Sequence, residues 1–291
     1  VPAAVALEMA RLDLGSLIRP GQQVAVTAGS RGITDMAAVL IRVIQELRGL
    51  GAQPFIVPAM GSHGGATAEG QAALLAGYGL TAERLGVPLR AAMDVVEIGR
   101  TPRGLPVFMA REAFAADHLV VVNRVKPHTD FEAPVESGLL KMLVVGLGKQ
   151  RGAEQFHNAV LHHGYYDILM EMARVALARG PVTFGLGIVE NQREETAILR
   201  GARREGLADL DRELLVEAKR LLPRIPFRAI DLLIVDWMGK DVSGTGMDQN
   251  VIARTVIKVG TAPATPSIRR IFVRDLTAKS QGMATGIGNA D

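Results

Sequence analysis

Two histidine- and arginine-containing loops have residue types that suit acid–base and carboxylate chemistry. His63 lies between glycines in the sequence GSHGG, where packing gives little reason for an imidazole. Because an imidazole titrates near neutral pH, His63 is a candidate general acid or base. Arg31 follows Ser30 in the sequence GSRG, and a guanidinium can grip a carboxylate or phosphate through two hydrogen bonds. The alternative is structural: a strand-to-helix turn with a solvated arginine, and an exposed loop histidine.

A third candidate loop, residues 123–130 with the sequence NRVKPHTD, gathers two cations, His128 and a carboxylate within eight positions. Pro127 stiffens the approach to His128. A fourth lies at residues 243–250, SGTGMDQN, where glycines and hydroxyls could cradle a phosphate or another polar ligand. Neither loop is decisive alone, because the first also fits a solvated loop and the second matches no Walker or dinucleotide motif.

Lys141 is a lone cation inside the apolar run GLLKMLVV. A charged amine is costly to bury, so Lys141 must reach solvent, pair with another group, or act as a nucleophile that carries a Schiff base or a cofactor. His157 follows sixteen residues later in the middle of a predicted helix, whereas His162 and His163 stand at its end, where the helix dipole favours cations. Without cysteine or a His-Glu-x-x-His pattern, these histidines argue against a conventional structural zinc.

The elements that must position these loops alternate between buried strands and amphipathic helices, which predicts an α/β fold. Strands are expected at residues 24–28, 54–60, 119–125 and 182–189. Helices are expected at residues 35–50, from about Thr67 onward, at 152–163, at 165–179 and at 209–222. The candidate loops follow the strands, where open parallel sheets place their ligand sites.

Prolines at residues 223–226 suggest a domain boundary, with further strands expected at 230–237 and 269–274. The sequence therefore predicts a Rossmann-like parallel-sheet N-terminal domain over residues 1–226, and a smaller, incomplete-looking C-terminal α/β domain over residues 227–291.

Composition narrows the class of protein. The net charge of the 291-residue chain is only +3 and no dense Lys/Arg tract is present, which argues against nucleic-acid binding. The absence of cysteine excludes disulfides, thiolate catalysis and zinc–thiolate sites. No apolar run reaches 18 residues and no charged-then-apolar leader opens the chain, so neither a membrane span nor a signal peptide is expected and a cytoplasmic location is predicted.

Taken together, the loops resemble the nickel-pincer-nucleotide lactate racemase (LarA-like) family of 2-hydroxyacid racemases and epimerases. The order matches: an arginine loop, a glycine-flanked histidine, a Pro-His pair, a lysine in a Gly-rich apolar segment, and a later histidine. The separation of Lys141 from His157 equals that between the family's cofactor lysine and nickel histidine, and the separation of Arg31 from His63 is close to the family's. The turn into residues 248–250 resembles the start of the family's second domain.

The resemblance implies a lysine-tethered nickel-pincer nucleotide, a pyridinium-3-thioamide-5-thiocarboxylic acid mononucleotide carrying nickel. Lys141 would hold it through a thioamide, and His157 would be the protein ligand in the nickel plane. The implied reaction is hydride transfer from and back to C2 of a 2-hydroxyacid, with His63 and His128 as the paired acid–base groups and Arg31 on the carboxylate. The implied lining of the cofactor or substrate pocket comprises Ser30, Asp248, Gln249 and Asn250.

Departures from the family pattern fall in the substrate pocket. The segment from His128 to Lys141 is about three residues longer, and residues 129–132 are more acidic than the aromatic-rich segment of the family. Val256 stands where the family has a pocket lysine, and Lys258 is out of register. These differences predict a 2-hydroxyacid other than lactate, for example a larger or polyhydroxylated one.

The expected partners are this substrate and the cofactor maturation enzymes, without nucleic acid or membrane; an oligomer is compatible with the sequence. Two alternatives stay open. One is a metal-free Schiff-base lysine enzyme, an aldolase or decarboxylase that uses Lys141. The other is a non-enzymatic nucleotide-binding module that uses the Gly-rich turns.

Overall fold

Two compact units make up the chain. The computed structural model describes residues 1–30, 32–129, 131–239, 241–255, 265–280 and 282–291. Unit 1 comprises Val1–Lys126 and Pro134–Ala218, and unit 2 comprises Pro127–Ala133 and Lys219–Asp291. The domain division predicted between residues 226 and 227 stays a prediction. In the part of the chain that the structure describes, no helix is long and apolar enough to cross a lipid bilayer.

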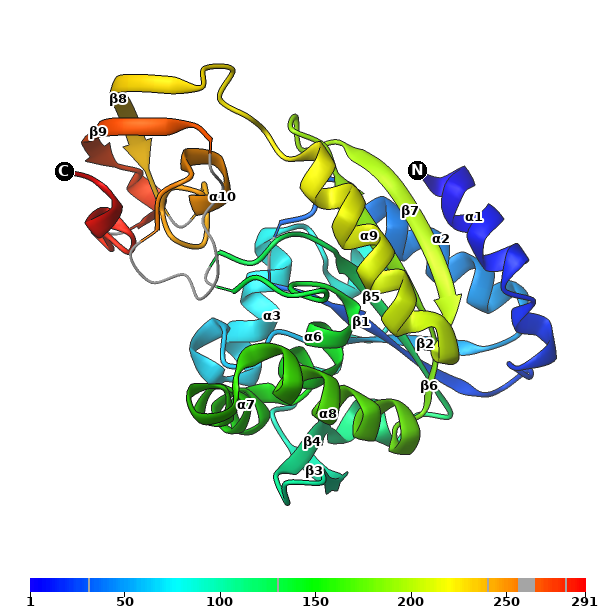
Figure 1. Cartoon of the computed structure of the whole chain (residues 1–291). Coiled ribbons are helices and arrows are strands. Elements are labelled where there is room, and N and C mark those ends of the chain that lie inside the picture. The colour runs from blue at the N-terminus through cyan, green and yellow to red at the C-terminus, as the bar shows by residue number, and fades with distance from the viewer. Residues whose placement is uncertain (31, 130, 240, 256–264, 281) are drawn as a thin grey trace. The chain divides into compact units, whose positions relative to one another are not determined.

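Unit 1 is built on a five-stranded sheet in the order β2-β1-β5-β6-β7 (Figure 1). Four strands are parallel and only β7 runs antiparallel. The strands are β1 (Gln23–Ala28), β2 (Gln53–Pro58), β5 (His118–Arg124), β6 (Val182–Glu190) and β7 (Thr196–Arg203). The predicted α/β fold with a mainly parallel sheet is confirmed, and the continuous apolar runs of β1, β5 and β6 reflect a sheet buried on both faces.

Helices cover both faces of this sheet. Alternate residues of β6 define the two sides: Phe184, Leu186 and Ile188 join the core cluster of α1 (Pro2–Arg11) and α2 (Met36–Gly49). The intervening glycines of β6 let leucine side chains of α9 (Leu207–Leu221) approach the opposite face closely. The result is a three-layer arrangement, with a sheet between two helical layers.

The remaining helices of unit 1 agree with the predicted ones where the amphipathic pattern is strong. The predicted helix at 165–179 matches α8, and Thr67 caps α3 by accepting a hydrogen bond from the Gly70 amide. The helices are α3 (Ala68–Gly77), α4 (Ala82–Leu85), α5 (Arg111–Phe114), α6 (Leu139–Lys141), α7 (Lys149–His163) and α8 (Tyr165–Arg179). Between α6 and α7 the chain forms a π-helix, Met142–Gly146, which the sequence indicated only as an apolar segment.

A two-stranded antiparallel hairpin of β3 (Val95–Arg100) and β4 (Pro106–Ala110) was not predicted from the sequence. The pattern of β3 is weak because a β-bulge between Glu97 and Gly99 interrupts the alternation of apolar and polar side chains. Helix α1 and strand β7 were also missed.

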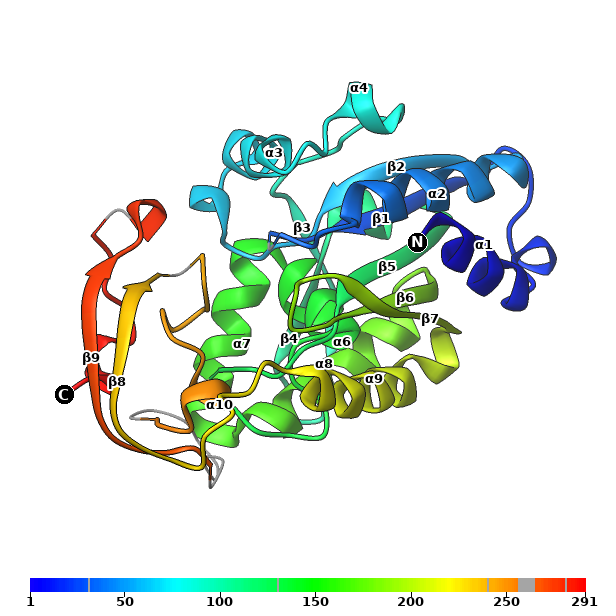
Figure 2. The same cartoon turned by 90° about the horizontal axis from the view of Figure 1, so that it is seen from above.

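Unit 2 contains the parallel strand pair β8 (Ala229–Met238) and β9 (Ser267–Leu276), seen side by side in Figure 2, and the short helix α10 (Gln249–Ile252). These strands confirm the two expected at 230–237 and 269–274. A small core lies on one side of the pair, whereas several large apolar side chains of β8 and β9 are exposed: Leu232, Ile234, Trp237 and Phe272.

Candidate functional site

The ends of β1 and β2 bring Ser30 and His63 together. The two strands are parallel neighbours, so the loops that follow them leave the same edge of the sheet. Ser30 Oγ and His63 Nδ1 share a hydrogen bond of 2.6 Å, and the Tyr78 hydroxyl donates to the Ser30 carbonyl at 3.0 Å. The imidazole of His63 is exposed while one ring nitrogen is held by Ser30. This bond engages Nδ1 and fixes the orientation of the ring.

The π-helix Met142–Gly146 contacts both loops. The Gly61 amide, at the start of the His63 loop, donates to the Gly146 carbonyl at 3.0 Å. A Cβ on Gly29, next to Ser30, would lie 3.0 Å from the Met142 side chain. Residue 146 must be glycine here, because a Cβ would lie 2.7 Å from the Ala59 carbonyl oxygen. The Ser30 and His63 loops therefore pack against the helical segment that begins with Lys141.

Lys141 and His157 lie on either side of this π-helix and interact electrostatically. Partial burial lowers the pKa of His157, and the nearby Lys141 cation lowers it further. A neutral imidazole is the form that binds a metal ion. The Lys141 Nζ lies 5.7 Å from the centre of the Tyr165 ring, within the range of a cation–π contact. Burial raises the pKa of Tyr165 well above its usual value, as do the charges of Asp211 and Glu136, so the phenol stays neutral.

Asp211, which the sequence analysis did not single out, fixes the start of the lysine segment. Its fully buried carboxylate, on α9, accepts from the backbone amides of Leu139 and Leu140, both at 2.9 Å. Asn123 donates its Nδ2 to the Gly138 carbonyl at 2.9 Å, just before the same turn. A sequence signal existed, since Asp211 is the charged residue inside the apolar stripe of α9.

Lys149 and Gln71 are two further buried polar residues that sequence reasoning missed. Both are 0% exposed, and the Lys149 Nζ donates to the Gln71 Oε1 at 2.9 Å. Lys149 is the first residue of α7, the helix that carries His157, and Gln71 contacts the His63 loop. The available signal was a second lysine within an otherwise apolar, Gly-rich segment.

Unit 2 holds the other predicted residues. Asp248 caps α10 by accepting from the Asn250 amide at 2.9 Å, and the Asn250 Nδ2 donates to the His128 carbonyl at 3.4 Å. The rings of His128 and Phe131 are 5.0 Å apart. Gln249 is 1% exposed, yet neither its amide nitrogen nor its amide oxygen has a hydrogen-bond partner among the described residues. Buried amides are normally paired, so Gln249 is a candidate contact for a polar group of a ligand.

The predicted site residues thus fall into two groups. Ser30, His63, Lys141 and His157 surround the π-helix of unit 1. His128, Asp248, Gln249 and Asn250 lie together in unit 2. Arg31, Val256 and Lys258 lie outside the described residues.

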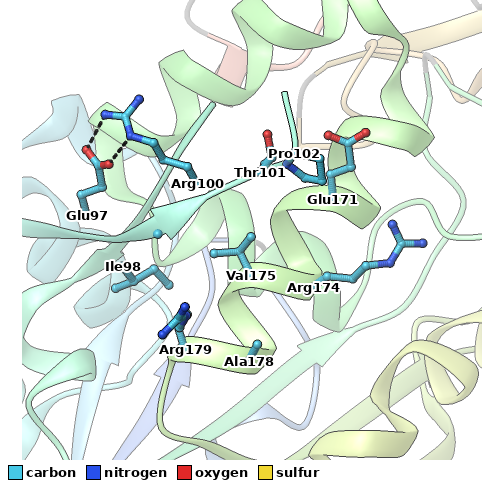
Figure 3. Close-up of a pocket in the computed structure, with 11 residues that line it drawn as sticks. Glu97, Ile98, Arg100, Thr101, Pro102, Glu171, Arg174, Val175, Ala178 and Arg179 are labelled. Carbon is cyan, nitrogen blue, oxygen red and sulfur yellow. Dashed lines mark hydrogen bonds and ion pairs between the residues drawn. The ribbon is translucent and has the colours of Figure 1, made fainter. Parts of the chain in front are cut away.

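A pocket of about 810 Å³ lies elsewhere in unit 1, between the β3 strand and helix α8 (Figure 3). It is lined by charged side chains that pair with neighbours: Arg100 contacts Glu97 at 2.8 Å, and Glu171 accepts from Arg103 at 2.9 Å. None of the predicted site residues lines this pocket, so it offers no support for the predicted chemistry.

A comparison with models of known protein families shows to which family the chain belongs. The model of the lactate racemase N-terminal domain matches residues 2–167, more than half of the chain and all of the region from the Ser30 loop to His157. The chain belongs to the lactate racemase N-terminal domain family. The resemblance inferred from loop order and spacing is confirmed by this match. No curated protein sequence matches the chain.

Two solved structures share the fold. One is a structural-genomics crystal structure of a Thermotoga maritima protein, with a TM-score of 0.62 and 15% identity over 83% of this chain and 64% of that one. The other is the lactate racemase apoprotein from Thermoanaerobacterium thermosaccharolyticum, with a TM-score of 0.55 and 15% identity over 79% of this chain and 58% of that one. The chain therefore spans about three fifths of the length of these two proteins.

The donor set of unit 1 fits a cofactor that brings most of its own metal ligands. Among the described residues no group of three His, Asp or Glu side chains could hold a metal ion. A nickel site with a single protein ligand needs no such group, and a chain without cysteine cannot supply the soft donors that square-planar nickel accepts. Lys141 and His157, which interact electrostatically, are the two residues of unit 1 that could hold such a cofactor.

Proposed function

We propose that the protein is a nickel-pincer-nucleotide-dependent racemase or epimerase of a 2-hydroxyacid. The observation that supports it most directly is the interaction of Lys141 with His157 across the π-helix, next to the His63–Ser30 pair. When bound, the nickel-pincer nucleotide would supply the hydride acceptor and donor for C2 of the substrate. The protein's own side chains would attach this group, orient the substrate and move the hydroxyl proton.

Lys141 and His157 are proposed to hold the cofactor. The half-buried position of Lys141 near the Tyr165 ring keeps its amine in a defined place for covalent attachment. The side chain of His157 reaches solvent and its pKa is lowered, so its imidazole is neutral and accessible to a metal ion. Attachment through a thioamide also removes the charge of Lys141, which makes His157 a better electron-pair donor.

His63 and His128 are proposed as the acid–base pair. In the first half-reaction one imidazole removes the proton of the C2 hydroxyl, and in the second the other imidazole gives a proton to the 2-keto oxygen, so the two enantiomers use the two histidines in opposite roles. Ser30 would hold His63 by the 2.6 Å hydrogen bond, and Asn250 would hold the His128 backbone. Arg31 is proposed to bind the substrate carboxylate.

The proposed substrate is a 2-hydroxyacid other than lactate, with a larger or polyhydroxylated side chain. The support is the amide of Gln249, which has no hydrogen-bond partner within the described part of the chain and can both donate to and accept from a hydroxyl group. Ser243, with an unpaired and buried hydroxyl among the described residues, adds a second polar group in the same unit.

The test is to co-express the protein with cofactor maturation enzymes and measure intact mass, peptide mass and nickel content. A nucleotide-sized adduct should appear on the peptide that contains Lys141, with about one nickel per chain, as expected for one attachment site. Lys141→Ala should lose the adduct. His157→Ala should keep the adduct and lose most of the nickel.

An adduct on Lys126 or Lys149, or unchanged nickel in the His157 variant, would refute the assignment. Trapping of substrate on Lys141 by borohydride without nickel would favour the Schiff-base enzyme instead. Nucleotide binding that is unaffected by substitution of His63 and His128, with no turnover, would favour the binding module.

A further inference from the structure

We propose that Lys149 is a positioning residue that, through Gln71, fixes the backbone of the His63 loop to the helix that carries His157. This inference rests on the proposed function, because it gives His63 a role in proton transfer. It concerns unit 1 alone, and it assigns a task to two buried side chains that the proposed attachment and acid–base roles leave unused.

Lys149 is buried at a backbone position that does not suit it. The side chain is 0% exposed, and the backbone φ of 53° lies in the left-handed region that glycine prefers. The Nζ donates to the Pro58 carbonyl at 2.7 Å and to the Gln71 Oε1 at 2.9 Å, both neutral acceptors. Burying a lysine on neutral partners costs free energy, and burial lowers the pKa of Lys149 to about 8. We infer that the hydrogen bonds of the buried ammonium group have a specific role that offsets this free-energy cost.

That contact fixes the orientation of Gln71. An ammonium group can only donate, so the amide oxygen of Gln71 must face Lys149. The amide nitrogen then faces the other way, where it donates to the Gly61 carbonyl at 2.9 Å and to the His63 carbonyl at 3.2 Å. Gln71 is itself 0% exposed, so solvent cannot replace these bonds. Lys149 therefore determines which end of the amide meets the loop.

The loop depends on these bonds because its backbone is irregular. Gly61, Gly64 and Gly65 all have positive φ values, and so does Ala66. The side chain of His63 is held at Nδ1 by Ser30. With the His63 carbonyl held by Gln71 and its ring held by Ser30, both ends of the residue are fixed, as proton transfer over a short distance requires.

The contacts of Lys149 also connect two elements of the proposed site. Lys149 begins α7, whose third turn carries His157, and Pro58 ends β2, which leads into the His63 loop. One ammonium group therefore joins the metal-ligand helix to the loop of the acid–base histidine.

Two variants distinguish the loss of the Lys149–Gln71 contact from a general loss of stability. Lys149→Met keeps the length of the stem and removes the ammonium. Gln71→Glu keeps an acceptor for Lys149, as an ion pair, and removes the donor to the two loop carbonyls. Thr101→Val is the matched control, because Thr101 is 4% exposed and its Oγ1 accepts from the Leu105 amide in the β3–β4 turn.

The first measurement is amide hydrogen exchange in protein made without the cofactor. Exchange of the amides of residues 61–66 should rise about tenfold in both variants relative to Thr101→Val, as expected for loss of one to two hydrogen bonds. The imidazole ¹⁵N shifts of His63 should show a mixture of ring tautomers in place of one dominant form. If Lys149→Met fails to fold, Gln71→Glu gives the same readout with Lys149 still paired.

The second measurement is steady-state kinetics of cofactor-loaded protein. Both variants should keep their nickel content, lose about tenfold in kcat, and change little in KM for the 2-hydroxyacid. Wild-type exchange in both variants, or an equal rise in Thr101→Val, would overturn the positioning role. Altered exchange and His63 shifts in a protein that never turns over a 2-hydroxyacid would leave the positioning role intact and refute the proposed function.

Discussion

Asp211 combines complete burial with two backbone donors, and these act on its pKa in opposite directions. Burial raises the pKa to about 6, although the amides of Leu140 and Leu139 lower it. Because the folded-state pKa exceeds the unfolded value of 3.8, the folded protein binds this proton more tightly. The group therefore stabilises the fold most at acidic pH, and up to about 3 kcal/mol is lost as pH rises from about 4 to about 6.

Asp211→Asn should lower the free energy of unfolding, because an amide can accept from only one of the two backbone donors. Since asparagine does not titrate, the deficit should be larger near pH 4.5 than near pH 7.5. Urea unfolding at both pH values measures it, with Asp209→Asn as the control, since that side chain is on the same helix and largely exposed. An equal or larger deficit near pH 7.5 would mean that the ionised carboxylate is the stabilising form.

The Ser30 hydroxyl has a role that can be isolated from its surroundings. Ser30→Ala removes the 2.6 Å bond to His63 and should lower kcat about tenfold, because the imidazole then loses one fixed partner. Tyr78→Phe is the control, since it removes the bond to the Ser30 carbonyl and leaves the hydroxyl in place. Steady-state kinetics of the cofactor-loaded variants would measure both effects on kcat. An effect of Tyr78→Phe as large as that of Ser30→Ala would indicate loop displacement instead.

At the scale of elements, the turn before α6 is tightly constrained. A Cβ on Gly138 would lie 2.1 Å from the Asp211 Oδ1, so Gly138→Ala must push the carboxylate off the two amides that it accepts. We expect a loss of about 1–3 kcal/mol in the free energy of unfolding and weaker cofactor attachment at Lys141. Thermal unfolding and adduct mass measure the two effects.

Gly77→Ala provides the comparison for that substitution. Gly77 ends α3, and nothing lies within 4 Å of the position that a Cβ would take there, so alanine should raise stability slightly through helix propensity. Equal free energies of unfolding for the two alanine variants would show that Asp211 can move without loss of stability.

Strong local patterns made part of this fold predictable. The apolar runs of β1, β5 and β6 and the amphipathic pattern of α8 gave the sheet and its helices within a few residues. Loop order gave the family, since Lys141 and His157 keep their family spacing. The contacts of Asp211, Lys149 and Gln71 could not be predicted, because they join positions that are tens of residues apart. The π-helix was missed since its apolar sequence fits an α-helix equally well.

At the scale of the whole molecule, the proposed reaction uses two histidines that lie 65 residues apart in the sequence, His63 and His128. If the two serve opposite faces of one substrate, each single His→Ala variant should lose interconversion in both directions by about 10²- to 10⁴-fold. Each variant should still convert one enantiomer to the 2-keto acid in a single turnover, and the two variants should prefer opposite enantiomers.

Rapid-mixing absorbance measurements on loaded protein with each enantiomer separately would show this preference. His162→Ala, at the end of α7, serves as the histidine control and should keep both activities. Retention of the same enantiomer by the His63 and His128 variants would show that one of the two loops does not act on the substrate.

The π-helix Met142–Gly146 also restricts the insertions and deletions that this part of the chain can tolerate. A π-helix closes its turn through hydrogen bonds between residues five apart, one residue more than in an α-helix, so a single deletion would remove the extra residue that this wider turn holds. The loops of Ser30 and His63 both contact this turn, so they would lose contacts that its present length provides. Insertions and deletions between Lys141 and Gly146 should therefore be eliminated by selection. Mechanical fit around this turn therefore constrains the sixteen-residue interval between Lys141 and His157 as strictly as the chemistry of the two side chains does.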